Sequence, residues 1–144
     1  MKKLFLSVLL VALASVSLAD KPPVYSSWGN AIRGYDPVAF FTESKAVEGD
    51  KAIQYEWQDT TWLFSSVENK ALFVENPEQY APQYGGYCAW AVSQGYTASV
   101  DPTAWTIVDD KLYLNYSRSV HSRWKQNVSQ NIKLGDANWP NVLD

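Results

Sequence analysis

The sequence contains very few of the side chains that bind soft metals or act as nucleophiles. Cys88 is the only cysteine, His121 is the only histidine, and the single methionine is Met1. No disulfide can form within the chain. A Ser-His-Asp triad would have to use His121, and no Gly-x-Ser-x-Gly pattern accompanies it. The sequence therefore predicts a binding protein rather than an enzyme.

Clusters of positive charge are also missing. The chain holds twelve Lys and Arg against fifteen Asp and Glu, and two of the lysines stand at the N-terminus. Nucleic-acid binding needs grouped basic side chains, so nucleic acid is not an expected partner. Gly85-Gly86 lacks the frame of a phosphate-binding loop, which excludes the common nucleotide motifs.

The N-terminus indicates export. Two lysines precede an apolar run from Leu4 to Leu18, and small residues at its end suit a cleavage site. The run is shorter than a membrane anchor requires. We expect residues 1–19 to be a signal peptide and residues 20–144 to form one domain without a membrane span. The protein is then expected to be periplasmic or secreted.

Apolar patterns divide residues 20–144 into short strands and helices. Strand patterns over 53–57 and 61–64, and again over 105–108 and 112–116, predict two β-hairpins. A further apolar strand is expected over 38–41. These strands alternate with helical patterns, so the sequence predicts a single small α+β domain with two hairpins and three to four helices.

The helices are predicted from capping signals and spacing. Ser65 and Glu68 have the spacing of a capping box, which predicts a helix up to the Asn76-Pro77 pair. Apolar residues recur every four positions from Val120 to Ile132 and predict one long C-terminal helix. Gly135 is expected to end it.

Segments from most of this domain resemble the YHS-domain family. They are Gly34–Ala39, Phe64–Tyr80, Tyr84–Ala89, Leu112–Tyr116 and Asn138–Pro140. The resemblance implies a YHS-like fold over residues 33–140. It also implies a link to metals, because copies attached to metal-transporting ATPases carry three cysteines in this region. Here those positions hold Ala39, Ser65 and Asn69, which are poor ligands for a soft metal.

Cys88 is the candidate ligand for copper or another soft metal, since a thiolate is a common ligand for such ions. His121 and Asp36 are the other candidate ligands. One copy cannot complete a thiolate-rich site, but a homodimer that joins two Cys88 side chains would supply two thiolates to monovalent copper. The sequence thus predicts an exported metal-binding accessory protein.

Each candidate ligand has an ordinary structural alternative. Cys88 lies among alanines on a short predicted helix, which favours burial as core filler. His121 stands beside the apolar stripe of its helix and is expected to face solvent. Asp36 precedes a proline, where a carboxylate usually accepts hydrogen bonds from nearby backbone.

Aromatic side chains support a different class of function. The chain has seven Trp, nine Tyr and five Phe. Trp57 and Trp62, on paired strands, and Tyr87 with Tyr113, near the glycine turn, could form an exposed surface that stacks a sugar, a peptide or a planar cofactor. The alternative function is therefore a metal-free binding or assembly module with an unknown partner. The same aromatic side chains could instead be buried and fill the hydrophobic core.

Overall fold

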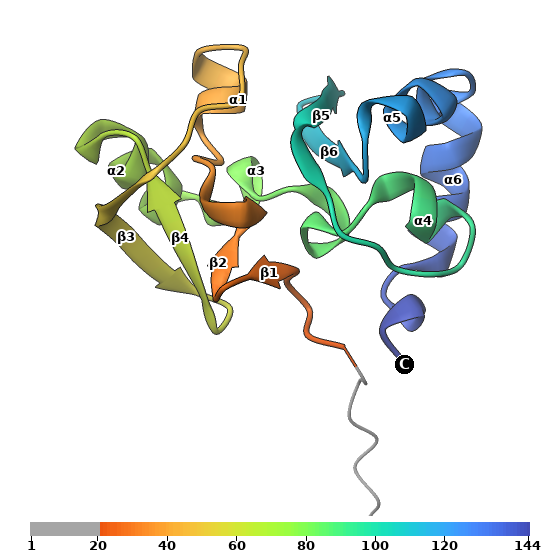
Figure 1. The fold of residues 1–144 in the computed structure, drawn as a ribbon, viewed down its shortest axis with the longest axis horizontal. Coiled ribbons are helices and arrows are strands. Elements are labelled where there is room, and N and C mark those ends of the chain that lie inside the picture. Colours follow the sequence, from red (N-terminus) through yellow and green to blue (C-terminus); the bar gives the residue numbers. More distant parts are fainter. Residues whose placement is uncertain (1–20) are drawn as a thin grey trace, which may run out of the picture.

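The computed structural model describes residues 21–144, and the predicted signal peptide lies outside them. The fold is α+β, as predicted, and forms a single small domain (Figure 1). Its strands are β1 (Ser26–Ser27), β2 (Asn30–Ala31), β3 (Asp50–Trp57), β4 (Thr60–Phe64), β5 (Asp101–Val108) and β6 (Lys111–Asn115). Its α-helices are α1 (Ala39–Thr42), α2 (Val67–Glu75), α3 (Pro77–Tyr80), α4 (Ala89–Ser93), α5 (Arg118–Lys125) and α6 (Val128–Asn138).

The N-terminal half is built on a four-stranded sheet in the order β1-β2-β4-β3. β3 and β4 form the first predicted hairpin, whose register pairs Trp57 with Thr60. Its turn residues Gln58 and Asp59 both have positive φ, the backbone of a two-residue hairpin loop. β2 joins this hairpin by a parallel bridge between Asn30 and Thr61.

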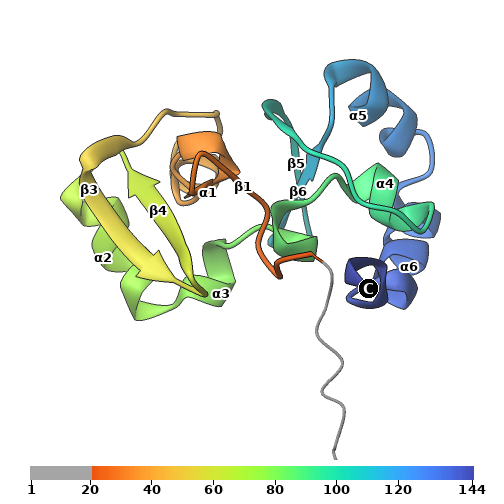
Figure 2. The same ribbon diagram turned by 60° about the horizontal axis from the view of Figure 1, so that its bottom comes forward.

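The C-terminal half contains the second predicted hairpin, β5 with β6, together with α4, α5 and α6. Asp109 and Asp110 form its turn, again with positive φ at both positions. Both views show the two halves side by side, with the chain crossing between them in the α3 region (Figures 1 and 2).

A shared core holds the halves together. One cluster joins Phe64 and Phe73 of the first half to Leu112 and Leu114 of the second. A smaller cluster lies within the second half around Trp124. Burial of apolar surface common to both sheets explains why the chain forms one domain. Within residues 21–144, no helix combines the length and the apolar character that a membrane crossing needs.

The expected strand over 38–41 is wrong, because this segment forms the short helix α1. The Asp36 carboxylate accepts hydrogen bonds from the N–H groups of Val38 and Ala39, at 2.8 and 3.2 Å. These bonds satisfy donors that the first turn of a helix leaves unpaired. The expected capping box of Ser65 and Glu68 is also wrong: Ser66 is the N-cap and accepts a bond from the Asn69 N–H, whereas the Ser65 hydroxyl donates to Asp36.

The single long C-terminal helix is also wrong. Asn127 has an extended φ of −150° and separates α5 from α6. The Asn131 side-chain amide donates to the Trp124 carbonyl at 2.9 Å and satisfies an acceptor at the end of α5. Gly135 does not end α6, which continues to Asn138.

Candidate ligand-binding cleft

Cys88 is a core residue with 1% of its surface exposed. Its Sγ accepts a hydrogen bond from the Tyr116 N–H at 3.2 Å and lies 3.6 Å from Asn115 Oδ1, to which the thiol donates. Burial raises the pKa of the Cys88 thiol, despite backbone donors that favour the thiolate. This environment matches the expectation of buried packing and does not favour the charged form that binds metals.

Asp36 is completely buried and fully hydrogen-bonded. Besides the bonds to α1, its Oδ2 accepts from the Ser65 N–H, the Ser65 hydroxyl and the Asn69 side-chain amide, at 2.8, 2.7 and 2.8 Å. Ala39, through its backbone N–H, and Ser65 and Asn69 thus all donate to one carboxylate. These are the three positions that the expected resemblance aligns with cysteines. The expectation that Asp36 bonds nearby backbone is confirmed.

His121 is half-buried, so the expectation that it faces solvent is wrong. Its Nε2 is hydrogen-bonded to the Thr106 hydroxyl on the neighbouring strand β5. Burial, helped by the nearby Lys125, lowers the pKa of His121 and favours the neutral ring.

The three candidate ligands have separate partners on different elements. Within residues 21–144, no group of three or more Cys, His, Asp and Glu side chains could hold a metal ion. Copper binding through Cys88 stays a prediction.

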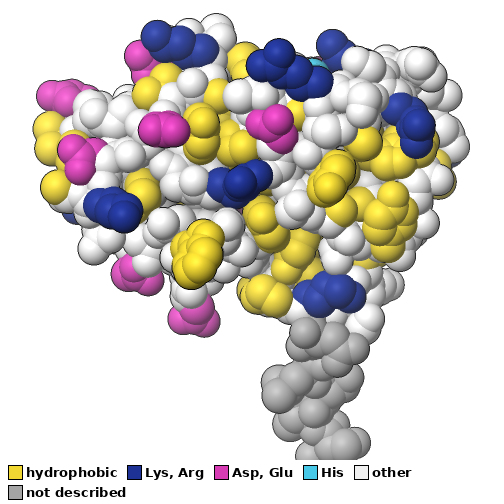
Figure 3. Space-filling model, viewed as in Figure 1, with side chains coloured by type: hydrophobic (Ala, Val, Ile, Leu, Met, Phe, Trp, Pro, Cys, Tyr) yellow, Lys and Arg dark blue, Asp and Glu magenta, His cyan; other side chains and the backbone are white. Residues whose placement is uncertain are grey.

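A small apolar hollow of about 230 Å³ lies next to Cys88. Trp90, Tyr96 and Tyr116 contribute most of its large side chains. Arg123 covers the Trp90 ring, with its guanidinium carbon 5.6 Å from the ring centroid. Figure 3 shows apolar side chains gathered on this half of the molecule, over α4 and the segment that leads to β5.

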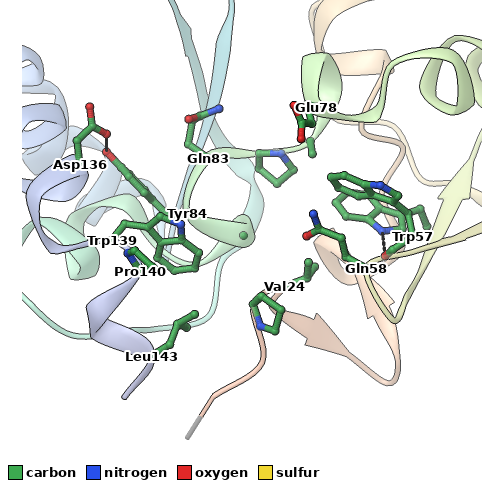
Figure 4. A pocket seen from close by; sticks show the side chains of 15 residues that line it. Val24, Trp57, Gln58, Glu78, Gln83, Tyr84, Asp136, Trp139, Pro140 and Leu143 are labelled. Carbon is green, nitrogen blue, oxygen red and sulfur yellow. Dashed lines mark hydrogen bonds between the residues drawn. The ribbon is translucent and has the colours of Figure 1, made fainter. Parts of the chain in front are cut away.

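A larger cleft of about 560 Å³ separates residues of the two halves. Figure 4 shows Trp57, Gln58 and Glu78 on one side of it, Tyr84, Asp136 and Trp139 on the other, and Val24 near its base. The whole lining consists of Pro23, Val24, Trp57, Gln58, Trp62, Glu78, Ala81, Pro82, Gln83, Tyr84, Gly85, Asp136, Trp139, Pro140 and Leu143.

Aromatic pairs form both walls of this cleft. Trp57 and Trp62 lie 5.6 Å apart between ring centroids, and the Trp62 indole N–H donates to the Trp57 carbonyl at 3.0 Å. Tyr84 and Trp139 lie 6.1 Å apart on the opposite wall. Trp57 and Trp139 are each half-buried, so part of each ring is open to a ligand, whereas Trp62 and Tyr84 are buried and support them.

The backbone around Tyr84 is held in an uncommon conformation. Tyr84 has φ +58°, the left-handed region that a non-glycine residue rarely adopts. The Tyr84 hydroxyl donates to Asp136 Oδ1 at 2.9 Å and lies 3.3 Å from the Ile132 carbonyl. A Cβ at Gly135 would come within 2.4 Å of that hydroxyl, so the glycine inside α6 allows Tyr84 to reach the helix.

Gly85 brings the N-terminal segment against the cleft floor. A Cβ at this position would lie 1.9 Å from the Pro23 carbonyl oxygen, and the Gly85 carbonyl accepts from the Tyr25 N–H at 2.9 Å. The cleft is therefore formed by fixed backbone contacts between segments that are far apart in the sequence.

The charged side chains of the cleft lining are both acidic. Glu78 and Asp136 stand on opposite walls, and no lining residue among those the structure describes is Lys, Arg or His. Gln58 and Gln83 add neutral polar groups. The cleft can offer ring stacking, amide hydrogen bonds and negative charge to a ligand.

Sequence reasoning named part of this site. Trp57 and Trp62 were considered as an exposed binding surface, with packing in the core as the alternative. Both line the cleft, but Trp62 is a core residue with 1% of its surface exposed, so only Trp57 fits the binding surface. Tyr87 and Tyr113 are buried core residues instead, with 6% and 2% of their surface exposed. Tyr84 and Trp139 were not identified as site residues, because only the folded chain brings them opposite Trp57.

Comparisons with family models, curated proteins and solved structures found no match to this chain. The candidate site therefore rests on the sequence and on the geometry described above.

Proposed function

We propose that this protein is a binding module that takes a small ring-containing ligand in the cleft between its two halves. One observation carries the proposal: half-buried tryptophans, Trp57 and Trp139, stand on opposite walls of a cleft of about 560 Å³. Ligand pockets are typically of about 300 to 1,000 Å³ and are lined by aromatic side chains with a few polar groups.

The supporting contacts favour a cleft that exists before the ligand arrives. Trp57 is held against Phe73, 5.6 Å away in an edge-to-face contact, as well as against Trp62. Trp139 packs on both Tyr84 and Tyr87. A ring already fixed by its neighbours loses little conformational entropy when it stacks on a ligand, which improves affinity.

We further propose that the domain has a YHS-like fold but a different function from the YHS domains that carry three cysteines and are attached to metal-transporting ATPases. The convergence of positions 39, 65 and 69 on Asp36 supports the resemblance, because Ser65 and Asn69 lie 29 and 33 positions from Asp36 in the sequence. Ser65 and Asn69 both hydrogen-bond to the Asp36 carboxylate. These bonds explain why polar residues stand at the two positions without a bound metal. The predicted signal peptide would make the module a periplasmic or secreted protein.

The proposal is tested by filling the cleft. A library of small aromatic and saccharide compounds is screened by saturation-transfer NMR against the purified protein and against Gln83→Trp. Gln83 lies between the two walls, so a large ring there should occupy the space of the ligand. We expect compounds that bind the natural protein and lose binding in this variant.

The matched control is Gln54→Trp, which adds the same ring at an exposed position of β3 outside the cleft. Binding should survive this change. Compounds that bind all three proteins equally, or the absence of any binder at millimolar concentration, would refute the cleft as a ligand site.

A further inference from the structure

We infer that the ligand of this cleft carries a positively charged group, such as an alkylated ammonium, which is held between aromatic faces and two carboxylates. The inference rests on the proposed function and adds the charge of the ligand to it. Its basis is the pairing of Trp57 and Trp139 with Glu78 and Asp136, without an opposing basic side chain in the described lining.

The charge of the lining selects against anions. Glu78 and Asp136 give the cleft two negative charges and no positive charge of its own. Lys21 lies close to one end, but outside the lining, where its Nζ is directed to the Val142 carbonyl at 3.5 Å. An anionic ligand would be brought near two like charges in a partly desolvated space, which is unfavourable.

The aromatic walls suit a cation better than a neutral group of equal shape. A cation over the face of an indole is attracted by the ring quadrupole, and tryptophan gives the strongest such contact. Trp57 and Trp139 come from β3 and from the segment after α6, so a bound cation could meet a ring on each side. A neutral ligand would gain the stacking contact but not this attraction.

The two carboxylates are arranged differently. Glu78 is exposed in the first turn of α3, and its carboxylate makes no side-chain hydrogen bond within residues 21–144, so it is free to turn toward a ligand. Asp136 receives the Tyr84 hydroxyl on Oδ1. Burial, together with the hydrogen bond to Asp136 and its charge, raises the pKa of Tyr84 well above its ordinary value, so this hydroxyl stays protonated and donates to the carboxylate.

The test uses three probes of nearly the same shape and different charge. Choline is a cation, 3,3-dimethylbutan-1-ol is its neutral isostere, and 3,3-dimethylbutanoate is the anion. Binding is measured by calorimetric titration of the purified protein at low ionic strength. We expect choline to bind roughly tenfold more tightly than the alcohol, with the anion weakest, as a partly desolvated cation–π contact plus a carboxylate would give.

Isosteric variants identify the source of the preference. Glu78→Gln and Asp136→Asn each remove one charge, and the new Asn can still accept from Tyr84. Each should weaken choline several-fold and leave the alcohol unchanged. Glu43→Gln is the matched control, because Glu43 is exposed after α1 and does not line the cleft.

The outcomes separate the two proposals. Equal affinity for choline and the alcohol would overturn the cationic ligand while leaving a ring-binding cleft intact. A preference for choline that persists in both Glu78→Gln and Asp136→Asn would also overturn the inference, because the negative charge that attracts choline would then lie outside the cleft. Absence of binding by all three probes at millimolar concentrations would reject the inference, and the compound screen with Gln83→Trp would decide the cleft separately.

Discussion

Replacement of Asp36 by asparagine should strongly destabilise the fold, because this buried carboxylate accepts five hydrogen bonds. Asn has one accepting oxygen and one donating amino group. In its better orientation the amino group would replace Oδ1 and face the two N–H donors of α1, while the oxygen keeps the three bonds from Ser65 and Asn69. Two lost bonds to a charged group, at about 1.5 to 3 kcal/mol each, predict a loss of about 3 to 6 kcal/mol.

The assay is urea unfolding followed by tryptophan fluorescence, with the free energy extrapolated to water. A loss of this size is a large part of the stability of about 5 to 15 kcal/mol that is usual for a domain. Asp59→Asn is the control, because Asp59 lies in the exposed β3–β4 turn and should change stability by less than about 0.5 kcal/mol. A loss below about 1 kcal/mol for Asp36→Asn would refute the role assigned to this carboxylate.

Three further predictions concern single side chains. Trp28 is 99% exposed with φ +53° in the β1–β2 turn, so Trp28→Asn should raise stability in urea by about 1 kcal/mol; a decrease would show that the ring has a stabilising contact. Burial raises the pKa of Tyr113 to about 12. The contribution of the neutral Tyr113 hydroxyl to stability is therefore complete below the unfolded pKa of about 10 and is lost as pH rises to 12. Over this range the free energy of unfolding should fall more steeply with pH for the natural protein than for Tyr113→Phe. Equal slopes for the two proteins would contradict this prediction. Cys88 is buried and the pKa of its thiol is raised, so it should react with a small disulfide reagent only when the domain opens. If instead the natural protein binds copper stoichiometrically and Cys88→Ser does not, the prediction of a metal-binding accessory protein would be supported.

The hairpins could be predicted because their signals are local. Polar turns over 58–59 and 109–110 lie directly between alternating apolar runs, and the residues that form each turn also determine its register. The α+β class followed from the same short patterns.

The errors arose where distant residues determine local structure. Val38 and Ala39 have strand-forming neighbours, but the Asp36 carboxylate that starts α1 is fixed by Ser65 and Asn69, about thirty residues further on. Gly135 looked like a helix end because glycine commonly follows one. Its actual role, to admit the Tyr84 hydroxyl to α6, depends on a contact across 51 positions of sequence.

The cleft was only partly predictable for the same reason. Trp57 and Trp62 lie on neighbouring strands, so strand pairing alone places them together. Trp139 lies on the opposite wall, where it is placed by the packing of α6 and of residues distant in the sequence. Composition showed an excess of rings, but it could not separate Trp139 at the cleft from Trp124 in the core.

The most direct test of the cleft is to follow the seven indole N–H resonances of the protein during titration with a compound that binds it. The account predicts that Trp57 and Trp139 shift together and saturate at one concentration, while Trp28 and Trp105, which are outside the lining, keep their positions. Shifts confined to Trp28 or Trp105, with Trp57 and Trp139 unchanged at saturation, would contradict it.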